Sequence, residues 1–209
     1  KMIKYKTYFR KSSFKKDLLN ANILLNLVKK YKPKSFLEVG VLEGVTARNI
    51  CELMHKMHGY SFRYTGIDLF GLDINLNNNK EFTPISKKYS NPLKFLYFNY
   101  ILKNHPNSIN GVNYLLKKFA NSIDLHQGYS KDLLKKINLN MIDFIFLDGG
   151  HSYETVKDDV NIILNNSKKN SILVLDDYNQ KEYGVKKAVD EVKDKFENYQ
   201  TGRFLVIKK

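Results

Sequence analysis

The feature that most constrains the fold is a regular alternation of short apolar runs with longer stretches whose apolar residues have helical spacing. The apolar runs occupy residues 35–39, 62–69, 123–127, 141–147, 171–175 and 203–207. The helical stretches occupy residues 15–31, 45–58, 111–121, 130–137, 153–165 and 184–196. Strands that alternate with helices build βαβ units with right-handed crossovers. The sequence therefore predicts an α/β fold with a mostly parallel sheet and helices on both faces.

The chain shows no internal repeat and no linker, so residues 1–209 are expected to form a single domain. Residues 1–34 are expected to form an N-terminal helical cap, in which Pro33 ends the helix. Residues 70–110, rich in Asn and Pro, read as an insertion after the second strand that acts as a lid or as a substrate or oligomer loop. We expect most of its aromatic side chains to pack on the core. These are Tyr89, Phe95, Tyr97, Phe98 and Tyr100.

The net charge of +14 is carried almost entirely by lysine, because only four residues are arginine. Proteins that read nucleic acid favour arginine, so a solvated basic surface is the preferred interpretation, with nucleic-acid binding as the alternative. No apolar run approaches the ~20 residues that span a bilayer. Cys51 is the single cysteine, which agrees with a reducing compartment, and a cytoplasmic location is expected.

The first strand ends in a glycine turn, Glu38-Val39-Gly40, and a helix begins after Gly44. Ligands of open α/β sheets bind at the carboxyl ends of the strands. A dinucleotide site requires G-x-G-x-x-G, but Leu42 stands at the middle position and Glu43, whose carboxylate would repel a pyrophosphate, follows it. S-adenosylmethionine carries no phosphate and has a cationic sulfonium, so the turn favours this cofactor over NAD(P).

Asp68 ends the second strand and follows Gly44 by 24 residues, near the roughly 20-residue offset of residues that bind ribose hydroxyls. Alternatively, Gly40 and Gly44 only shape a tight turn, and Asp68 caps a helix. The order of these motifs on the expected elements favours the cofactor interpretation.

On these residues the chain resembles class I S-adenosylmethionine-dependent methyltransferases, over roughly Ser35 to Asp190. The resemblance implies a Rossmann-like sheet in which the Glu38, Gly40 and Gly44 turn wraps the methionine part of the cofactor. It also implies that Asp68 holds the ribose. The turn implied to lie beside the adenine comprises Gly128, Tyr129 and Ser130.

Two further motifs, D-G-G-H at 148–151 and D-D at 176–177, are similar to those of metal-dependent O-methyltransferases that act on sugars of natural products. In that subgroup the aspartates matching Asp148, Asp176 and Asp177 bind magnesium, and the histidine matching His151 is a candidate base. We therefore also expect Asp148 at the cofactor. The segment after Phe70 matches nothing in this subgroup, so the acceptor stays open.

The residues themselves support this interpretation. Asp148 ends the fourth strand and the Asp176–Asp177 pair ends the fifth, and neighbouring strands lie ~4.8 Å apart. Carboxylate oxygens and water suit Mg²⁺, or alternatively Mn²⁺. Histidine exchanges protons near neutral pH, which suits His151 as a general base or as a donor to the substrate. The aspartates could instead satisfy backbone groups or cap helices.

The favoured function is thus Mg²⁺-dependent methyl transfer to a hydroxyl of a small acceptor, such as a sugar, glycan or natural product, by a chain that could form homo-oligomers. Alternatives are a nucleic-acid methyltransferase, a non-catalytic cofactor-binding protein and an NAD(P) oxidoreductase.

Overall fold

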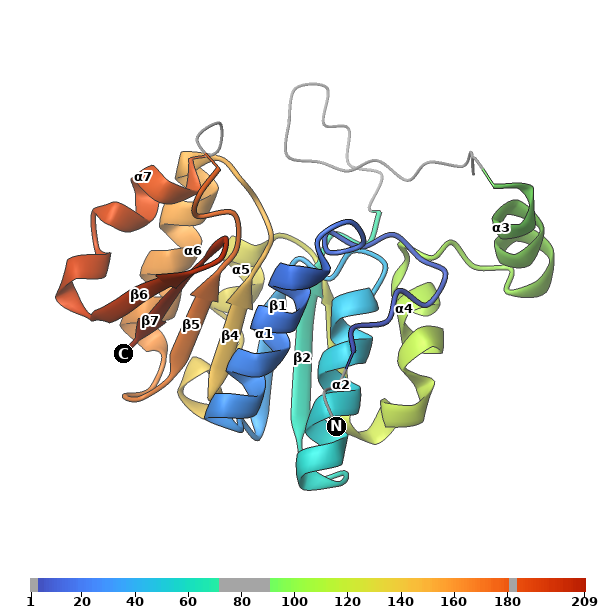
Figure 1. Ribbon diagram of the computed structural model, residues 1–209, viewed down its shortest axis with the longest axis horizontal. Coiled ribbons are helices and arrows are strands. Elements are labelled where there is room, and N and C mark those ends of the chain that lie inside the picture. The colour runs from blue at the N-terminus through green and yellow to red at the C-terminus, as the bar shows by residue number, and fades with distance from the viewer. Residues whose placement is uncertain (1–3, 72–90, 181–183) are drawn as a thin grey trace.

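The computed structural model describes residues 4–71, 91–180 and 184–209. Seven strands form one sheet, in the order β3-β2-β1-β4-β5-β7-β6 (Figure 1). The strands are β1 (Ser35–Val39), β2 (Arg63–Asp68), β3 (Ile123–Gln127), β4 (Phe144–Leu147), β5 (Ile172–Leu175), β6 (Glu197–Thr201) and β7 (Phe204–Lys208). The five strands β1 to β5 pair in parallel, and β7 is antiparallel to both of its neighbours. The predicted α/β fold with a mostly parallel sheet is confirmed.

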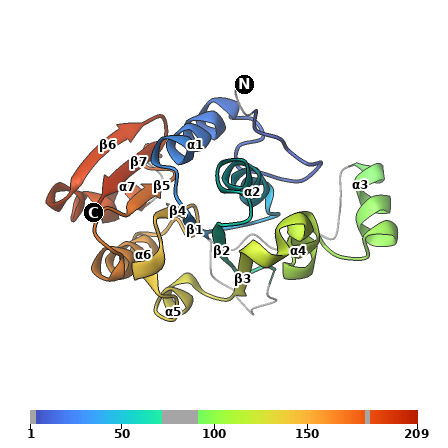
Figure 2. The ribbon, with the colours of Figure 1, turned by 90° about the horizontal axis from the view of Figure 1, so that it is seen from below.

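Helices cover both faces of this sheet (Figure 2). They are α1 (Leu18–Tyr31), α2 (Val45–His58), α3 (Pro92–Leu96), α4 (Ile109–Leu116), α5 (Ser130–Leu134), α6 (Tyr153–Asn166) and α7 (Val185–Asp190). Short 3-10 turns lie at Lys117–Ser122, Leu139–Met141 and Lys193–Lys195, and a π-helical turn at Tyr97–Ile101. Among the described residues, no helix has the length and apolar character needed to cross a bilayer.

The sheet separates two hydrophobic cores. Because side chains alternate along a strand, Phe36 of β1 faces α1 and α2, whereas Leu37 faces α5 and α6. The first core is rich in aromatic side chains, which include Phe14, Phe144 and Phe204. The second is largely aliphatic. Both faces of the central strands are therefore buried, as is typical of parallel sheets.

The N-terminal region is only partly the predicted helical cap. Helix α1 begins at Leu18 because the Asp17 side chain accepts a hydrogen bond from the backbone N–H of Asn20. Residues 4–17, which we call the strap, form no regular helix. The strap climbs along α2, reaches toward α4 and turns back across the carboxyl edge of the sheet into α1 (Figure 1).

The C-terminal region holds a strand that the sequence pattern did not predict. The predicted helix over residues 184–196 ends at Asp190, and β6 forms a hairpin with β7. Strand β6 has the sequence Glu-Asn-Tyr-Gln-Thr and pairs with β7 at the sheet edge. A polar edge strand lacks the apolar alternation by which half-buried strands are recognised.

Residues 72–90 of the predicted insertion, including Tyr89, lie outside the described residues. The part that is described contains α3 and the π-helical turn, and there the expected packing of the aromatic side chains is largely wrong. Phe98 is buried, but Phe95, Tyr97 and Tyr100 are exposed.

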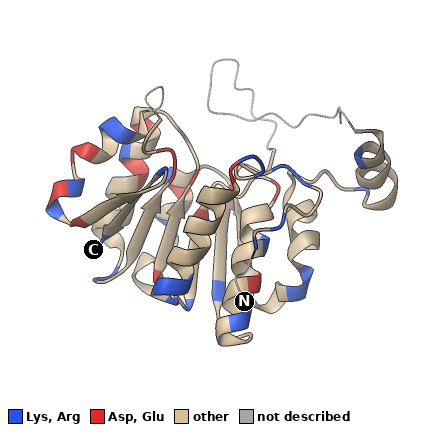
Figure 3. Cartoon of the chain, viewed as in Figure 1, with Lys and Arg blue, Asp and Glu red and all other residues tan. Residues whose placement is uncertain are grey.

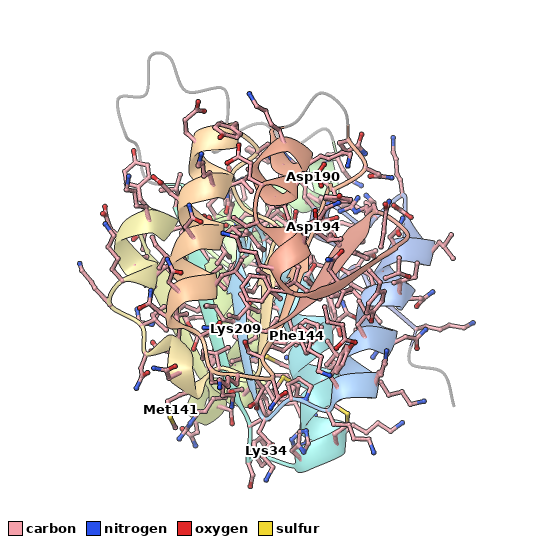
Figure 4. The ribbon with its side chains drawn as sticks, turned by 90° about the vertical axis from the view of Figure 1, so that its left-hand side faces the viewer. Lys34, Met141, Phe144, Asp190, Asp194 and Lys209 are labelled. Atoms are coloured by element: carbon pink, nitrogen blue, oxygen red, sulfur yellow. The ribbon has the colours of Figure 1, made fainter. Side chains whose placement is uncertain are left out.

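Strand direction determines where a ligand can bind. The strands β1, β2, β4 and β5 run parallel, so their carboxyl ends lie at the same edge of the sheet (Figure 1). Lys34 and Met141 lie at the opposite, amino-terminal edge of the sheet (Figure 4). The predicted site residues that follow these strands therefore gather at one edge, the edge at which α/β proteins bind ligands.

Candidate functional site

A pocket of about 820 Å³ lies at the carboxyl edge of the sheet. This volume falls within the ~300–1,000 Å³ of small-molecule sites. Its lining includes residues of the strap, of the turn after β1, of the start of α2, and of the segments that follow β2, β3, β4 and β5. The predicted residues in the lining are Gly40, Asp68, Gly128, Tyr129, Ser130, Asp148, His151 and Asp177.

Gly40 permits the close approach of β1 and the turn after β4. Its φ is +95°, and a Cβ atom placed on it would lie 2.0 Å from the backbone oxygen of Asp148. No side chain fits at that distance. The requirement at this position is thus steric as well as conformational.

Asp68 fixes the shape of the glycine turn. Its carboxylate accepts hydrogen bonds from the backbone N–H of Leu42, at 2.8 Å, and of Phe70, at 2.7 Å. The first bond supports the left-handed conformation of Leu42, whose φ is +52°. Burial raises the pKa of Asp68. Asp68 therefore has a structural role at the turn in addition to its place in the pocket lining.

Two acidic residues of the first motif point away from the pocket. The Glu38 carboxyl is buried and accepts a hydrogen bond from the Tyr64 hydroxyl, and burial raises its pKa to about 8. The Glu43 carboxylate accepts from the backbone N–H of Lys11, at 2.7 Å, in the strap. Neither residue is among the described residues that line the pocket, and the expected repulsion of a pyrophosphate by Glu43 has no geometric basis.

Gly44 also lies outside the described lining. It caps α2 with a φ of +76°, and a Cβ atom there would lie 2.8 Å from the Val112 side chain of α4. Its contribution is to the turn and to helix packing, while Val45 and Thr46 at the start of α2 face the pocket.

Three side chains that follow strands β4 and β5 converge in the pocket. One ligand atom each from Asp148, His151 and Asp177 lies within 4.8 Å of the others. The Nε2 atom of His151 lies 3.1 Å from the Asp177 carboxylate. Strands β4 and β5 are adjacent, with Leu147 paired to Leu175, so the residues that follow them are brought together. This donor set fits a divalent cation completed by water or acceptor oxygens.

Asp176 is oriented differently from its neighbour. Its buried carboxylate forms an ion pair with the Arg203 guanidinium and also accepts a hydrogen bond from the backbone N–H of Asp177, at 2.7 Å. It does not belong to the group of donors formed by Asp148, His151 and Asp177. The geometry favours Asp177, rather than Asp176, as the ligand from this pair.

Arg203 was not singled out in the sequence. It lies in the turn between β6 and β7, lines the pocket, and places its Nε atom 4.0 Å from an Asp177 carboxylate oxygen. Its guanidinium packs 4.6 Å from the centre of the Phe14 ring in the strap. The one signal in the sequence that could have indicated it is its residue type, because arginine is rare in this lysine-rich chain.

The site carries an excess of negative charge. Three aspartates face one arginine and one histidine, and burial, followed by the nearby charge of Asp176, raises the pKa of Asp148. A carboxylate in such surroundings is stabilised by an added cation. In Figure 3 acidic segments lie at the carboxyl ends of the strands, beside basic segments of the strap.

The strap completes the pocket, which the expectation of a helical cap missed. Lys11, Ser12 and Ser13 line it, and the Ser13 hydroxyl donates a hydrogen bond to the Asp148 carboxylate at 3.2 Å. The sequence of these residues has neither helical nor strand periodicity. Contacts with distant segments fix their conformation instead.

Comparisons with known proteins agree with this geometry. A family model described as a methyltransferase domain matches residues 37–178. No curated protein sequence matches the chain. Among solved structures, the chain is similar to CalS11, a calicheamicin methyltransferase, with a TM-score of 0.63 and 15% identity, covering 93% of this chain and 80% of that chain.

Two further structures have the same fold. The O-methyltransferase NovP gives a TM-score of 0.59 at 18% identity, covering 91% of this chain and 78% of its own. The O-methyltransferase from Bacillus cereus, solved with S-adenosylhomocysteine, gives 0.57 at 12% identity, covering 91% of this chain and 81% of its own. At such identities the likeness establishes the fold.

Proposed function

The chain belongs to the S-adenosylmethionine-dependent methyltransferases, and from that premise we propose that it methylates a hydroxyl of a small sugar or natural-product acceptor with the help of a divalent cation. The observation that carries this proposal is the cluster of Asp148, His151 and Asp177 within the pocket at the carboxyl edge of the sheet. The printed descriptions of two neighbours support the acceptor class. CalS11 is a TDP-rhamnose 3'-O-methyltransferase, and TomG is an O-methyltransferase of tomaymycin synthesis.

In the proposed arrangement Asp68 and the turn from Gly128 to Ser130 hold the adenosine part of the cofactor. The reactive methyl group would then share this pocket with Asp148 and with the bound acceptor. Binding both reactants in one pocket converts a bimolecular displacement into an effectively unimolecular one, which supplies a large share of the rate.

Asp148 and Asp177 would hold Mg²⁺ or Mn²⁺, and the cation, when bound, lowers the pKa of the acceptor hydroxyl and orients it. Asp176, paired with Arg203, positions Asp177 through the hydrogen bond to its backbone. The surplus negative charge of the site favours binding of a cation together with the acceptor over binding of a neutral acceptor alone.

His151 is the proposed base. The Nε2 atom of His151 lies 3.1 Å from the Asp177 carboxylate, a contact that holds the imidazole in the pocket, where it would take the proton of the acceptor hydroxyl. The Asp177 carboxylate then stabilises the resulting imidazolium. The acceptor oxygen forms its bond to the methyl carbon as the carbon–sulfur bond breaks. Sulfur keeps the bonding pair and leaves as the neutral thioether of S-adenosylhomocysteine.

The test is transfer of labelled methyl groups from S-adenosylmethionine to a panel of nucleotide sugars and hydroxylated natural products, with and without EDTA. We expect turnover of at least one acceptor and a loss of about 100-fold in EDTA, restored by Mg²⁺, because a cation contributes several kcal/mol to such a step. Unchanged turnover in EDTA would remove the cation from the proposal. Methylation of nucleic acid instead of the panel would replace the acceptor class.

A further inference from the structure

The described part of the predicted insertion exposes an apolar surface. Residues 91–103, which we call the arm, comprise α3 and the π-helical turn and lie at the outer end of the molecule, beyond α4 (Figures 1 and 2). Phe98 is buried, and its ring centre lies 5.6 Å from the Arg10 guanidinium. Six other apolar side chains of the arm are exposed. They are Leu93, Phe95, Leu96, Tyr97, Tyr100 and Ile101.

The exposed side chains of the arm gather on its outer face. The spacing of Leu93, Leu96 and Tyr100, at i, i+3 and i+7, places them on one side of a helical segment, whereas the buried Phe98 and Leu102 fall on the other side. Single exposed apolar residues are ordinary on proteins. Apolar residues that gather on one exposed face mark an interaction surface. The arm is therefore built to contact a partner.

The surroundings of the arm are basic. Residues 91–123 contain four lysines and no acidic residue. The Nζ atom of Lys94 lies 4.9 Å from the centre of the Phe9 ring, an exposed aromatic side chain of the strap. Burial, and next the charge of Lys15, lower the pKa of Lys94, because positive charges of the strap and of the arm lie near one another. Such a surface favours a partner with negative charge.

A second copy of the chain does not complement this surface. It would bring the same basic surroundings, and two chains of net charge +14 repel each other. A stable protein interface also takes about 20–30 residues from each partner, whereas the exposed apolar residues of the arm number six.

Nucleic acid would supply negative charge but matches the apolar residues poorly. Bases stack on aromatic rings. The outer face of the arm includes the aliphatic side chains of Leu93, Leu96 and Ile101, which offer no ring. The surface of an anionic bilayer, in contrast, combines negative headgroups with an apolar interior.

We propose that the arm binds the surface of anionic lipid bilayers, with Leu93, Leu96 and Tyr100 entering the headgroup boundary and nearby lysines contacting lipid phosphates. Tyrosine suits this depth, because its ring is apolar and its hydroxyl can stay hydrated. No residue of the arm is among the described residues that line the pocket, so this peripheral binding is separate from the proposed function.

Vesicle co-sedimentation tests this surface. The wild-type chain is mixed with vesicles of phosphatidylcholine alone, or of phosphatidylcholine and phosphatidylglycerol in equal parts. We expect binding to the mixed vesicles to be at least about tenfold tighter, because only they carry negative headgroups. Binding should weaken as salt is added, since salt screens this attraction.

Variants separate the apolar and the charged contributions. Leu96→Ser combined with Ile101→Ser removes two exposed apolar side chains without a change in charge, and should weaken binding to the mixed vesicles by at least about tenfold. Lys94→Gln combined with Lys103→Gln should weaken it to a similar extent. Met141→Ser is the matched control, because Met141 is 66% exposed at the amino-terminal edge of the sheet (Figure 4). It should bind within about twofold of the wild type.

Several results would overturn the proposal. These are an absence of vesicle binding by the wild type, equal binding to both kinds of vesicle, and equal binding by the wild type and the Leu96/Ile101 double variant. Light scattering and an RNA oligonucleotide test the other partners. A dimer that the double variant loses, or RNA binding through the arm without vesicle binding, would also overturn it. Thermal unfolding at the wild-type temperature is expected for the double variant, because both side chains are exposed.

Discussion

Two parts of the pocket lining are built by different means. Around Gly40 the backbone provides the shape, and the acidic side chains of that region are occupied by protein groups, since Asp68 bonds to Leu42 and Glu38 to Tyr64. Around Asp148 the side chains provide the character of the site, and their charges are only partly balanced by Arg203. The first part depends on the shape of the backbone, and the second part depends on the charges of its side chains.

This difference indicates which substitutions each part of the lining tolerates. In the part that depends on shape, added atoms should abolish ligand binding. Loss of a charge whose side chain is bound by other protein groups should have little effect on binding. In the part that depends on charge, loss of a single charge should weaken binding even when the shape of the site is kept.

The largest effect is expected from Gly40→Ala. The new methyl group would lie 2.0 Å from the Asp148 backbone oxygen, and the φ of +95° is itself unfavourable for alanine. We expect a loss of at least about 2 kcal/mol in the free energy of unfolding, and no measurable S-adenosylhomocysteine binding. Denaturant unfolding and calorimetry check the two effects.

Gly59→Ala is the matched control for Gly40→Ala. Gly59 also has a positive φ, of +62°, but no atom lies within 4 Å of an added Cβ. It should lose about 1–2 kcal/mol from backbone strain alone and keep its affinity for S-adenosylhomocysteine. Equal loss of binding in both variants would contradict the steric role assigned to Gly40.

The smallest effect on binding is expected from Glu38→Gln. Burial raises the pKa of Glu38 to about 8, so the folded state holds a proton that the unfolded state releases above the ordinary pKa of ~4.3. Stability contributed by protonated Glu38 is therefore present at acidic pH and is lost as the pH rises toward 8. Glu38→Gln should flatten this fall by up to about 1.4 kcal/mol per pH unit.

Unfolding curves at pH 5, 6, 7 and 8 measure this slope, with exposed Glu197→Gln as the control that leaves it unchanged. Affinity for S-adenosylhomocysteine should stay within about twofold of the wild type at pH 7. A large loss of affinity would instead support the original expectation that the Glu38 side chain serves the cofactor.

Local pattern was sufficient to predict the central sheet. Apolar runs that end at Gly40, Asp68 and Asp148 reveal both the strands and the edge at which their side chains gather, because parallel strands place all their carboxyl ends together. Strand β6 was not predicted because its polar sequence, which suits the edge of a sheet, lacks the alternation of apolar residues.

Pattern could not predict what distant segments add to the site. The strap is held by the three backbone acceptors of Arg10, and Arg203 reaches Asp176 from 27 residues away. Nor does sequence show which way a side chain turns. Glu38 and Glu43 belong to the motif but face Tyr64 and Lys11, and Asp176 and Asp177 are adjacent but face different partners.

The proposed mechanism depends most on a cation bound between Asp148 and Asp177. Its most direct test is Mn²⁺ titration of the chain loaded with S-adenosylhomocysteine, followed by calorimetry or by the paramagnetic signal of free Mn²⁺. We predict one site in the wild-type chain, weakened about 10- to 100-fold in Asp177→Asn and unchanged in Asp190→Asn, whose carboxylate pairs with Lys186 away from the pocket. Equal Mn²⁺ affinity in wild type and Asp177→Asn, or no Mn²⁺ binding by the wild type, would contradict it.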